Sequence, residues 1–424
     1  MSRVLPIELE KELKGSYSTS FFHIYMDGEF QTDLNLLSTN DRGTFIHEYV
    51  HYWQNIGTLW GLGNSILFYN EIRCLVNEIK SINDIKIPLH INFPKNICRE
   101  RKKYTIGNGT CSYDKYEGKC IDRSQKIVMS FDYDTSLGVR IPTIKLHIRF
   151  TDGSENDLYL GAHIIKESMA AMYQSLIDTE SSHPDVPYNI IKILCMDYYP
   201  NYCNNIEFLI CACYASLFSM KPGDTFIQLM EYAAKENITD GITLLSTHFD
   251  TCTVCSSKHN SRISITKCFD DMIDCFIKNL EDNLIAPLDY IKTVLNRMRL
   301  SHGWLPLLSV LKEDLANLND NLNEIIGFMG IPYVQATNGI TYPSTTKKTL
   351  EEQTEQDASV DVLELNAQEA VFRYLTTPLP CCPLYYMCQG SQYEKLECFD
   401  TPWLGSECSF TLAGYFLQGK NIHK

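Results

Sequence analysis

Apolar residues recur every three to four positions through much of this chain, which predicts a largely helical protein. In residues 44–54, Ile46, Val50 and Trp53 fall on one stripe, so this segment is predicted to be a buried helix that carries its polar residues into the interior. The same spacing predicts a second amphipathic helix over residues 65–82 and a third over residues 161–174.

Alternating and β-branched runs predict strands in two regions. One strand is expected at residues 21–26, as an edge that pairs with an extended substrate or as an ordinary core strand. A β insert is expected at about residues 88–160, with strands at 89–93, 126–131, 144–150 and 158–160. Between its first two strands, the basic cluster at residues 99–103 and Cys98, Cys111 and Cys120 predict a polar loop, in which the cysteines can hold a metal.

Helical spacing dominates the second half of the chain. The predicted helices cover residues 189–196, 206–218, 224–235, 261–280, 287–300 and 305–326. The chain therefore divides into a core at 1–180 with the β insert, a helical domain at 181–334 that completes the site, a polar linker or mobile loop at 335–366, and a Cys-rich segment at 367–424. The expected fold class is α+β.

The predicted helix at residues 44–54 contains the pattern HExxH. The four-residue spacing places His47 and His51 on one helical face, with Glu48 beside them. Imidazole nitrogens suit zinc, and a carboxylate that does not bind the metal can take a proton from zinc-bound water. The alternative is a chance match in a structural helix, but unpaired buried histidines and a carboxylate are costly, which favours a shared metal.

A third ligand is expected from the helix at residues 161–174. His163, Glu167, Ala170 or Ala171, and Gln174 lie on one stripe at spacings of three and four. Small alanines beside Glu167 would let this helix approach the first one closely. The alternative is a glutamate on a solvated face.

With His47, Glu48, His51 and Glu167 in these positions, the chain resembles the zincin metallopeptidases, and within them the gluzincin arrangement HExxH…E. It looks most like uncharacterised bacterial proteins that carry this pair of motifs, over roughly residues 20–220. The resemblance implies a zincin-like catalytic core, in which His47, His51 and Glu167 bind zinc and Glu48 is the general base.

The chain departs from the gluzincin pattern one turn after Glu167. Gluzincins often have an aspartate there that orients a ligating histidine, whereas this chain has Ala171. Gln54 and Gln174 are the candidates for that orienting role.

The group that stabilises the oxyanion is not fixed by the motif. His163 is a candidate for it, although it can also be a ligand or a buried histidine with a backbone partner. Tyr173, His183 and Tyr188 are further candidates, because they lie on or just after the helix that carries Glu167.

Charge and composition restrict the partners. A net charge of -15 argues against nucleic acid and anionic membranes, which need a basic surface. No apolar run has membrane-spanning length and no signal-peptide core follows Met1, so the chain is expected to be cytoplasmic. A protein or peptide substrate is the expected partner, and a regulatory protein partner stays open.

The 17 cysteines are expected to be reduced. Cys195, Cys211 and Cys213 are predicted core residues, whereas Cys252 and Cys255, followed by His259, have zinc-like spacing without a partner pair. A second, structural zinc is expected in the C-terminal segment, where cysteines are dense; they are Cys381, Cys382, Cys388, Cys398 and Cys408.

The sequence thus favours a zinc metallopeptidase that hydrolyses peptide bonds in a protein or peptide. Two alternatives remain. One is a zinc hydrolase that acts on another bond; the other is a non-enzymatic helical scaffold, which would have four protein ligands on zinc and no open position.

Overall fold

Two long helices, α1 (Thr39–Ile56) and α2 (Leu59–Lys80), meet at a tight corner. The Ser38 side chain caps α1 by accepting from the backbone N–H of Asp41, and Thr58 caps α2 by accepting from that of Gly61. A Cβ atom on Gly61 would lie 2.3 Å from the carbonyl oxygens of Gln54 and Asn55, so the corner requires glycine.

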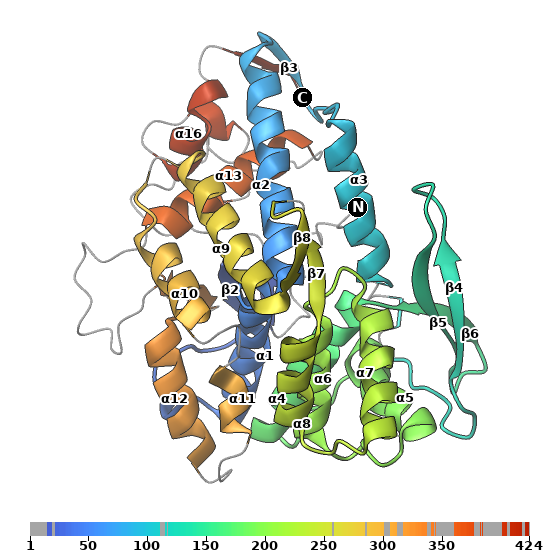
Figure 1. Cartoon of the computed structure of the whole chain (residues 1–424). Helices are drawn as coiled ribbons and strands as arrows, with labels where there is room; N and C mark the ends of the chain where they lie inside the picture. The colour runs from blue at the N-terminus through green and yellow to red at the C-terminus, as the bar shows by residue number, and fades with distance from the viewer. Residues whose placement is uncertain are drawn as a thin grey trace.

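The computed structural model describes residues 15–18, 22–110, 115–116, 118–256, 258–284, 286–300, 306–311, 317–336, 341–342, 344, 360–376, 382, 384, 401–404, 408–417 and 420–423. These residues form helices together with several small sheets, which confirms the α+β class (Figure 1).

Helix α4 (Ala162–Ile177) packs along α1 near the bottom of Figure 1. The contact is close because α1 has a glycine there. A Cβ atom on Gly43 would lie 2.9 Å from Cβ of Asp178 and 3.3 Å from Cγ of Gln174. This close approach brings side chains of α1 and α4 into contact.

A four-stranded sheet lies beside α1, in the order β1 (Gly15–Ser18), β2 (His23–Met26), β9 (Tyr333–Ala336) and β10 (Thr341–Tyr342). Strand β2 runs antiparallel to β1 and parallel to β9. The prediction that the strand at residues 21–26 forms an edge is therefore wrong, because both of its edges are already hydrogen-bonded. Its buried Ile24 and Met26 confirm the other expectation, an ordinary core strand.

A second sheet is antiparallel and projects to the right in Figure 1; it contains β4 (Val128–Asp134), β5 (Ile141–Arg149) and β6 (Glu155–Leu160). Its three strands agree with three of the predicted runs. The fourth prediction, at residues 89–93, is wrong. The strand forms earlier, as β3 (Asp84–Lys86), which pairs with β11 (Asn421–His423) and buries Ile85 completely.

The predicted polar loop at the basic cluster is also wrong, because these residues belong to helix α3 (Lys95–Asn108). Ile97 and Tyr104 are buried two turns apart, which anchors one face of the helix. Arg101 adds an ion pair to Glu71 of α2 at 2.7 Å. The other basic side chains project from the opposite face.

Helices fill most of the remaining chain. After the short π-helix η2 (Asp185–Asn189) come α5 (Ile190–Tyr198), α6 (Ile206–Ser216), α7 (Pro222–Glu236), α8 (Gly241–Thr251), α9 (Ile265–Glu281), α10 (Asp289–Leu300), α11 (Pro306–Val310) and α12 (Leu318–Met329). Helix α8 was not predicted. The strands β7 (Thr253–Ser256) and β8 (Ser261–Ser264) form a hairpin, so α9 begins four residues later than expected, and the single helix predicted at 305–326 is two helices.

The C-terminal part packs on α2. Helix α13 (Val360–Thr376) contacts α2, and α16 (Ser409–Ala413) packs on α13, with the short helices η6 (Pro402–Leu404) and η7 (Tyr415–Leu417) nearby. Helix α13 crosses the predicted boundary between the linker and the Cys-rich segment. One hydrophobic cluster joins buried residues from Phe22 to Leu365. Among the described residues, no helix combines the length and apolar character that a membrane span requires.

Candidate metal centre

Two histidines of α1 face the same space. His47 and His51 are one turn apart and their ring centroids are separated by 5.0 Å. His47 is 6% exposed. From Gly43 to Ile56 every residue of α1 is buried except His51, so α1 opens toward solvent at this histidine.

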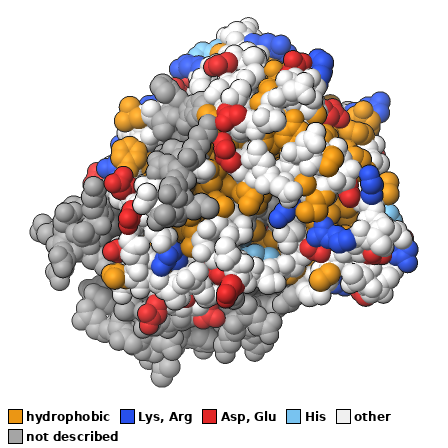
Figure 2. Space-filling view, turned by 90° about the horizontal axis from the view of Figure 1, so that it is seen from below, with side chains coloured by type: hydrophobic (Ala, Val, Ile, Leu, Met, Phe, Trp, Pro, Cys, Tyr) orange, Lys and Arg blue, Asp and Glu red, His pale blue; other side chains and the backbone are white. Residues whose placement is uncertain are grey.

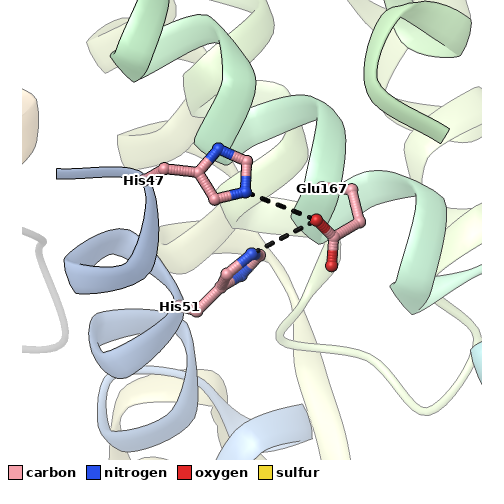
Figure 3. Close-up of side chains that lie close together, drawn as sticks. All are labelled: His47, His51 and Glu167. Carbon is pink, nitrogen blue, oxygen red and sulfur yellow. Dashed lines mark ion pairs between the residues drawn. The ribbon is translucent and has the colours of Figure 1, made fainter. Parts of the chain in front are cut away.

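Glu167 reaches both histidines from α4. Its Oε2 atom lies 3.5 Å from Nε2 of His47 and 3.3 Å from Nε2 of His51 (Figure 3). The candidate ligand atoms of the three residues all lie within 4.8 Å of one another. The structure therefore brings together the three residues that the sequence proposed as ligands.

The donor set and its spacing fit a metal ion. With zinc–ligand distances of about 2.0–2.1 Å and tetrahedral angles, neighbouring ligand atoms are separated by about 3.3 Å. The two measured separations, 3.3 and 3.5 Å, are close to this value. The group can thus bind a metal ion through two imidazole nitrogens and one carboxylate oxygen.

The charges of the three side chains reinforce one another. Burial alone would raise the pKa of Glu167, but His51 and His47 hold it well below its usual value. Burial lowers the pKa of His51, but the carboxylates of Glu167 and Glu48 together outweigh burial and raise it. The carboxylate is therefore ionised and available as a ligand.

Gln54 fixes the orientation of the His51 ring. The Nε2 atom of Gln54 donates to the backbone carbonyl of Lys166 at 3.1 Å, so its Oε1 atom is the acceptor 2.9 Å from Nδ1 of His51. A proton of His51 consequently lies on Nδ1, which leaves Nε2 as the nitrogen that can bind a metal ion at the site. The expectation that Gln54 orients a ligand is supported by this contact.

Glu48 lies beside the histidines without joining the ligand group. It is 6% exposed, and burial raises the pKa of its carboxyl against the opposing effect of His47 and His51. A buried carboxylate with raised proton affinity next to a metal site is suited to accepting a proton from water.

His163 lies one turn before Glu167 but is outside the three-residue group. Its Nδ1 atom is 3.9 Å from Oε1 of Glu167, beyond hydrogen-bond distance. Burial lowers the pKa of His163, so its ring is neutral at pH 7. It borders the site as a neutral side chain that is 23% exposed.

Aromatic rings surround His47 on its other side. The ring centroids of His183 and Tyr188 each lie 5.8 Å from that of His47. Gln174 forms no hydrogen bond with His47, His51 or Glu167. Its Oε1 atom lies 2.9 Å from Nε2 of His183. Gln174 thus acts on His183 rather than on a ligand.

Tyr173, another candidate for the oxyanion donor, differs from His183 and Tyr188 in its surroundings. It is buried, and its surroundings include Cys211 and Tyr214 of α6. Because Tyr173 is buried in the core, its position gives no support to the proposed role as an oxyanion donor.

The cysteine predictions divide by position. Cys381, Cys388 and Cys398 lie outside the described residues, so the structural zinc that they would share with Cys382 and Cys408 stays a prediction. Cys252 and His259 belong to the segment with zinc-like spacing, but each has another partner. The Sγ atom of Cys252 lies 3.2 Å from Nδ1 of His248, and Nε2 of His259 lies 2.7 Å from Oδ2 of Asp271. Within the described ranges, His47, His51 and Glu167 form the one group of metal-binding donors.

Two residues at the site escaped prediction. Gly43 permits the close packing of α1 and α4, and Lys166 directly precedes Glu167. The signal for Gly43 was available, since it lies one turn before His47 on the same stripe. No sequence signal distinguished Lys166 from an ordinary surface lysine.

Comparison with known proteins gives no relative: no protein-family model matches the chain, and neither the curated proteins nor the solved structures include a detectable match. The functional interpretation therefore depends on the residues and geometry of the site itself.

Proposed function

We propose that this chain is a zinc metallopeptidase that hydrolyses peptide bonds in a protein or peptide substrate. The observation that carries the proposal is the position of Glu167, whose Oε2 atom lies within 3.5 Å of both histidines of the HExxH motif. The three residues come from two helices that are far apart in the sequence. A chance HExxH match would not require a carboxylate at this point.

Zinc is the metal that this donor set favours. Two imidazoles and one carboxylate are a common ligand set of catalytic zinc sites, which leave a further position for water and substrate. A bound zinc ion would polarise the scissile carbonyl and lower the pKa of the attacking water. The opening of α1 at His51 is consistent with access from solvent.

Each protein side chain has a defined task in this proposal. His47, His51 and Glu167 bind the metal, and Gln54 keeps the Nε2 lone pair of His51 directed at it. Glu48 accepts the proton of the attacking water and passes it to the leaving amine.

The remaining task is to donate a hydrogen bond to the oxyanion. His163 and Tyr188 border the site, as does His183. A neutral imidazole N–H or a phenolic O–H can provide this hydrogen bond.

Two other functions share these residues. A zinc hydrolase that cleaves another bond would use the same ligands and base, and substrate profiling separates it from a peptidase. A scaffold with structural zinc would need a fourth protein ligand. The described residues place three donors together, which favours a catalytic site.

The test compares the zinc-loaded chain with Glu48→Gln by mapping cleaved peptide bonds across a cell proteome. The glutamine keeps the shape of the side chain but cannot accept a proton, so zinc content should be unchanged and cleavage should nearly disappear. Glu231→Gln, on the exposed face of α7, is the matched control and should cleave normally. A loss below about tenfold, or ~1.4 kcal/mol of barrier, would contradict the role of Glu48.

A further inference from the structure

Helix α4 presents one open face beside the candidate metal centre. Between Ala162 and Ala170, all residues are buried except His163, Lys166 and Glu167. Their spacing of three and four residues places them on one helical stripe. Lys166 therefore opens into the same space as the carboxylate and the neighbouring histidine.

The lower face of the molecule, toward which α1 and α4 lie in Figure 1, is shown in Figure 2. Near the centre of that view a histidine side chain lies among hydrophobic side chains, with a basic side chain close by.

Lys166 is a half-buried cation that has no counterion among the described residues. Its ammonium group forms no hydrogen bond or ion pair with any residue that the structure describes. Its backbone is fixed, because the Lys166 carbonyl accepts the hydrogen bond from Gln54. The side chain of Lys166 leaves the helix on the same open face as those of His163 and Glu167.

Glu167 forms no ion pair with the Lys166 ammonium group. Its carboxylate is directed at His47 and His51. Partial removal of an ammonium group from water is unfavourable unless an anion replaces the lost hydration. An anionic group of a bound molecule would supply that replacement.

We propose that Lys166 binds a carboxylate of the substrate, so that the site selects peptides with a negative charge next to the scissile bond. This inference rests on the proposed peptidase function. The carboxylate can come from an aspartate or glutamate side chain or from the free C-terminus of the peptide. Both present the same group to the ammonium of Lys166, and Lys166 is a specificity-determining residue in either case.

Binding to the zinc-loaded Glu48→Gln chain tests this without turnover. The probes are two matched pairs of N-acetylated alanine peptides, measured by calorimetry, and the C-terminus is amidated except where it is itself the group under test. One pair compares an internal aspartate with asparagine, and the other compares a free C-terminal carboxylate with its amide. The acidic member of at least one pair should bind at least about tenfold more tightly, as expected for a hydrogen bond to a charged group. The pair that shows the difference identifies the source of the carboxylate.

Three further variants, made in the same Glu48→Gln chain, assign the effect to Lys166. Lys166→Gln should remove the preference for the acidic peptide, and Lys166→Arg should keep most of it. Lys235→Gln is the control, since Lys235 lies on the exposed surface of α7. Equal binding of the acidic and neutral peptides, no binding of any acidic probe, or a preference that persists in Lys166→Gln would overturn the inference. Failure of the peptidase proposal itself would appear separately, as absence of cleavage that depends on Glu48.

Discussion

The Nδ1 atom of His51 donates a hydrogen bond to Oε1 of Gln54 at 2.9 Å, and both residues belong to α1. Gln54 also donates to the carbonyl of Lys166, the residue before Glu167. The orientation of one ligand is thus tied to the backbone that carries another. Such outer contacts hold a ligating histidine in the required tautomer.

Replacing Gln54 with leucine should weaken zinc binding by about 10- to 100-fold, because His51 loses the acceptor that fixes its proton on Nδ1. Competition with a chromophoric chelator measures this affinity. Gln228→Leu, on the surface of α7, is the control and should bind zinc as the unchanged chain does. An unchanged zinc affinity in Gln54→Leu would show that Gln54 does not orient the ligand.

Gly43→Val should lower both stability and zinc affinity. A side chain at this position would overlap Cβ of Asp178 and Cγ of Gln174, so α4 would have to move away from α1. The expected cost of such overpacking is about 1–3 kcal/mol. Ala234→Val, on the exposed face of α7, reports the cost of valine in a helix alone. Equal unfolding free energies for the two variants in urea would contradict the close packing of α1 and α4.

Asp271→Asn should destabilise the fold at neutral pH but much less in acid. Asp271 of α9 accepts hydrogen bonds from Lys258 and His259, which join the β7–β8 hairpin to α9. The hydrogen bond from Lys258 is the largest cause that lowers the pKa of Asp271 to about 2.

A carboxyl whose pKa is lowered by folding stabilises the protein above its ordinary pKa of 3.8, and this stabilisation is lost as the pH falls toward 2. Urea unfolding of the natural chain and the variant at neutral and acidic pH measures the difference. A difference that does not shrink on acidification would contradict the role of the ionised carboxylate.

The sequence predicted the metal group because its signals are local. HExxH places two histidines by helical spacing alone, and Glu167 lies on a recognisable stripe of its own helix. The antiparallel hairpin of β5 and β6 was also predictable, since runs of alternating apolar and polar residues flank a turn at residues 151–154.

The errors arise where distant parts of the chain decide the local structure. Strand β2 is internal because β9, some 300 residues later, pairs with it. Residues 84–86 form a strand because β11, at the other end of the chain, lies beside them. Helix α3 is held by Ile97 and Tyr104 and by an ion pair with α2, which a cluster of basic residues does not reveal. The proposed role of Lys166 could not be predicted either, because it depends on the absence of a counterion among the described residues of the folded chain.

The measurement that tests the central claim most directly is the zinc content of the purified chain and three variants by mass spectrometry. His47→Ala and Glu167→Gln should each lose one equivalent of zinc relative to the natural chain, because each removes a donor from the three-residue group. His163→Ala should keep that equivalent, since His163 lies outside the group. This difference holds whether or not the C-terminal cysteines bind a second zinc. Full zinc content in Glu167→Gln, together with loss of zinc in His163→Ala, would contradict Glu167 as the third ligand.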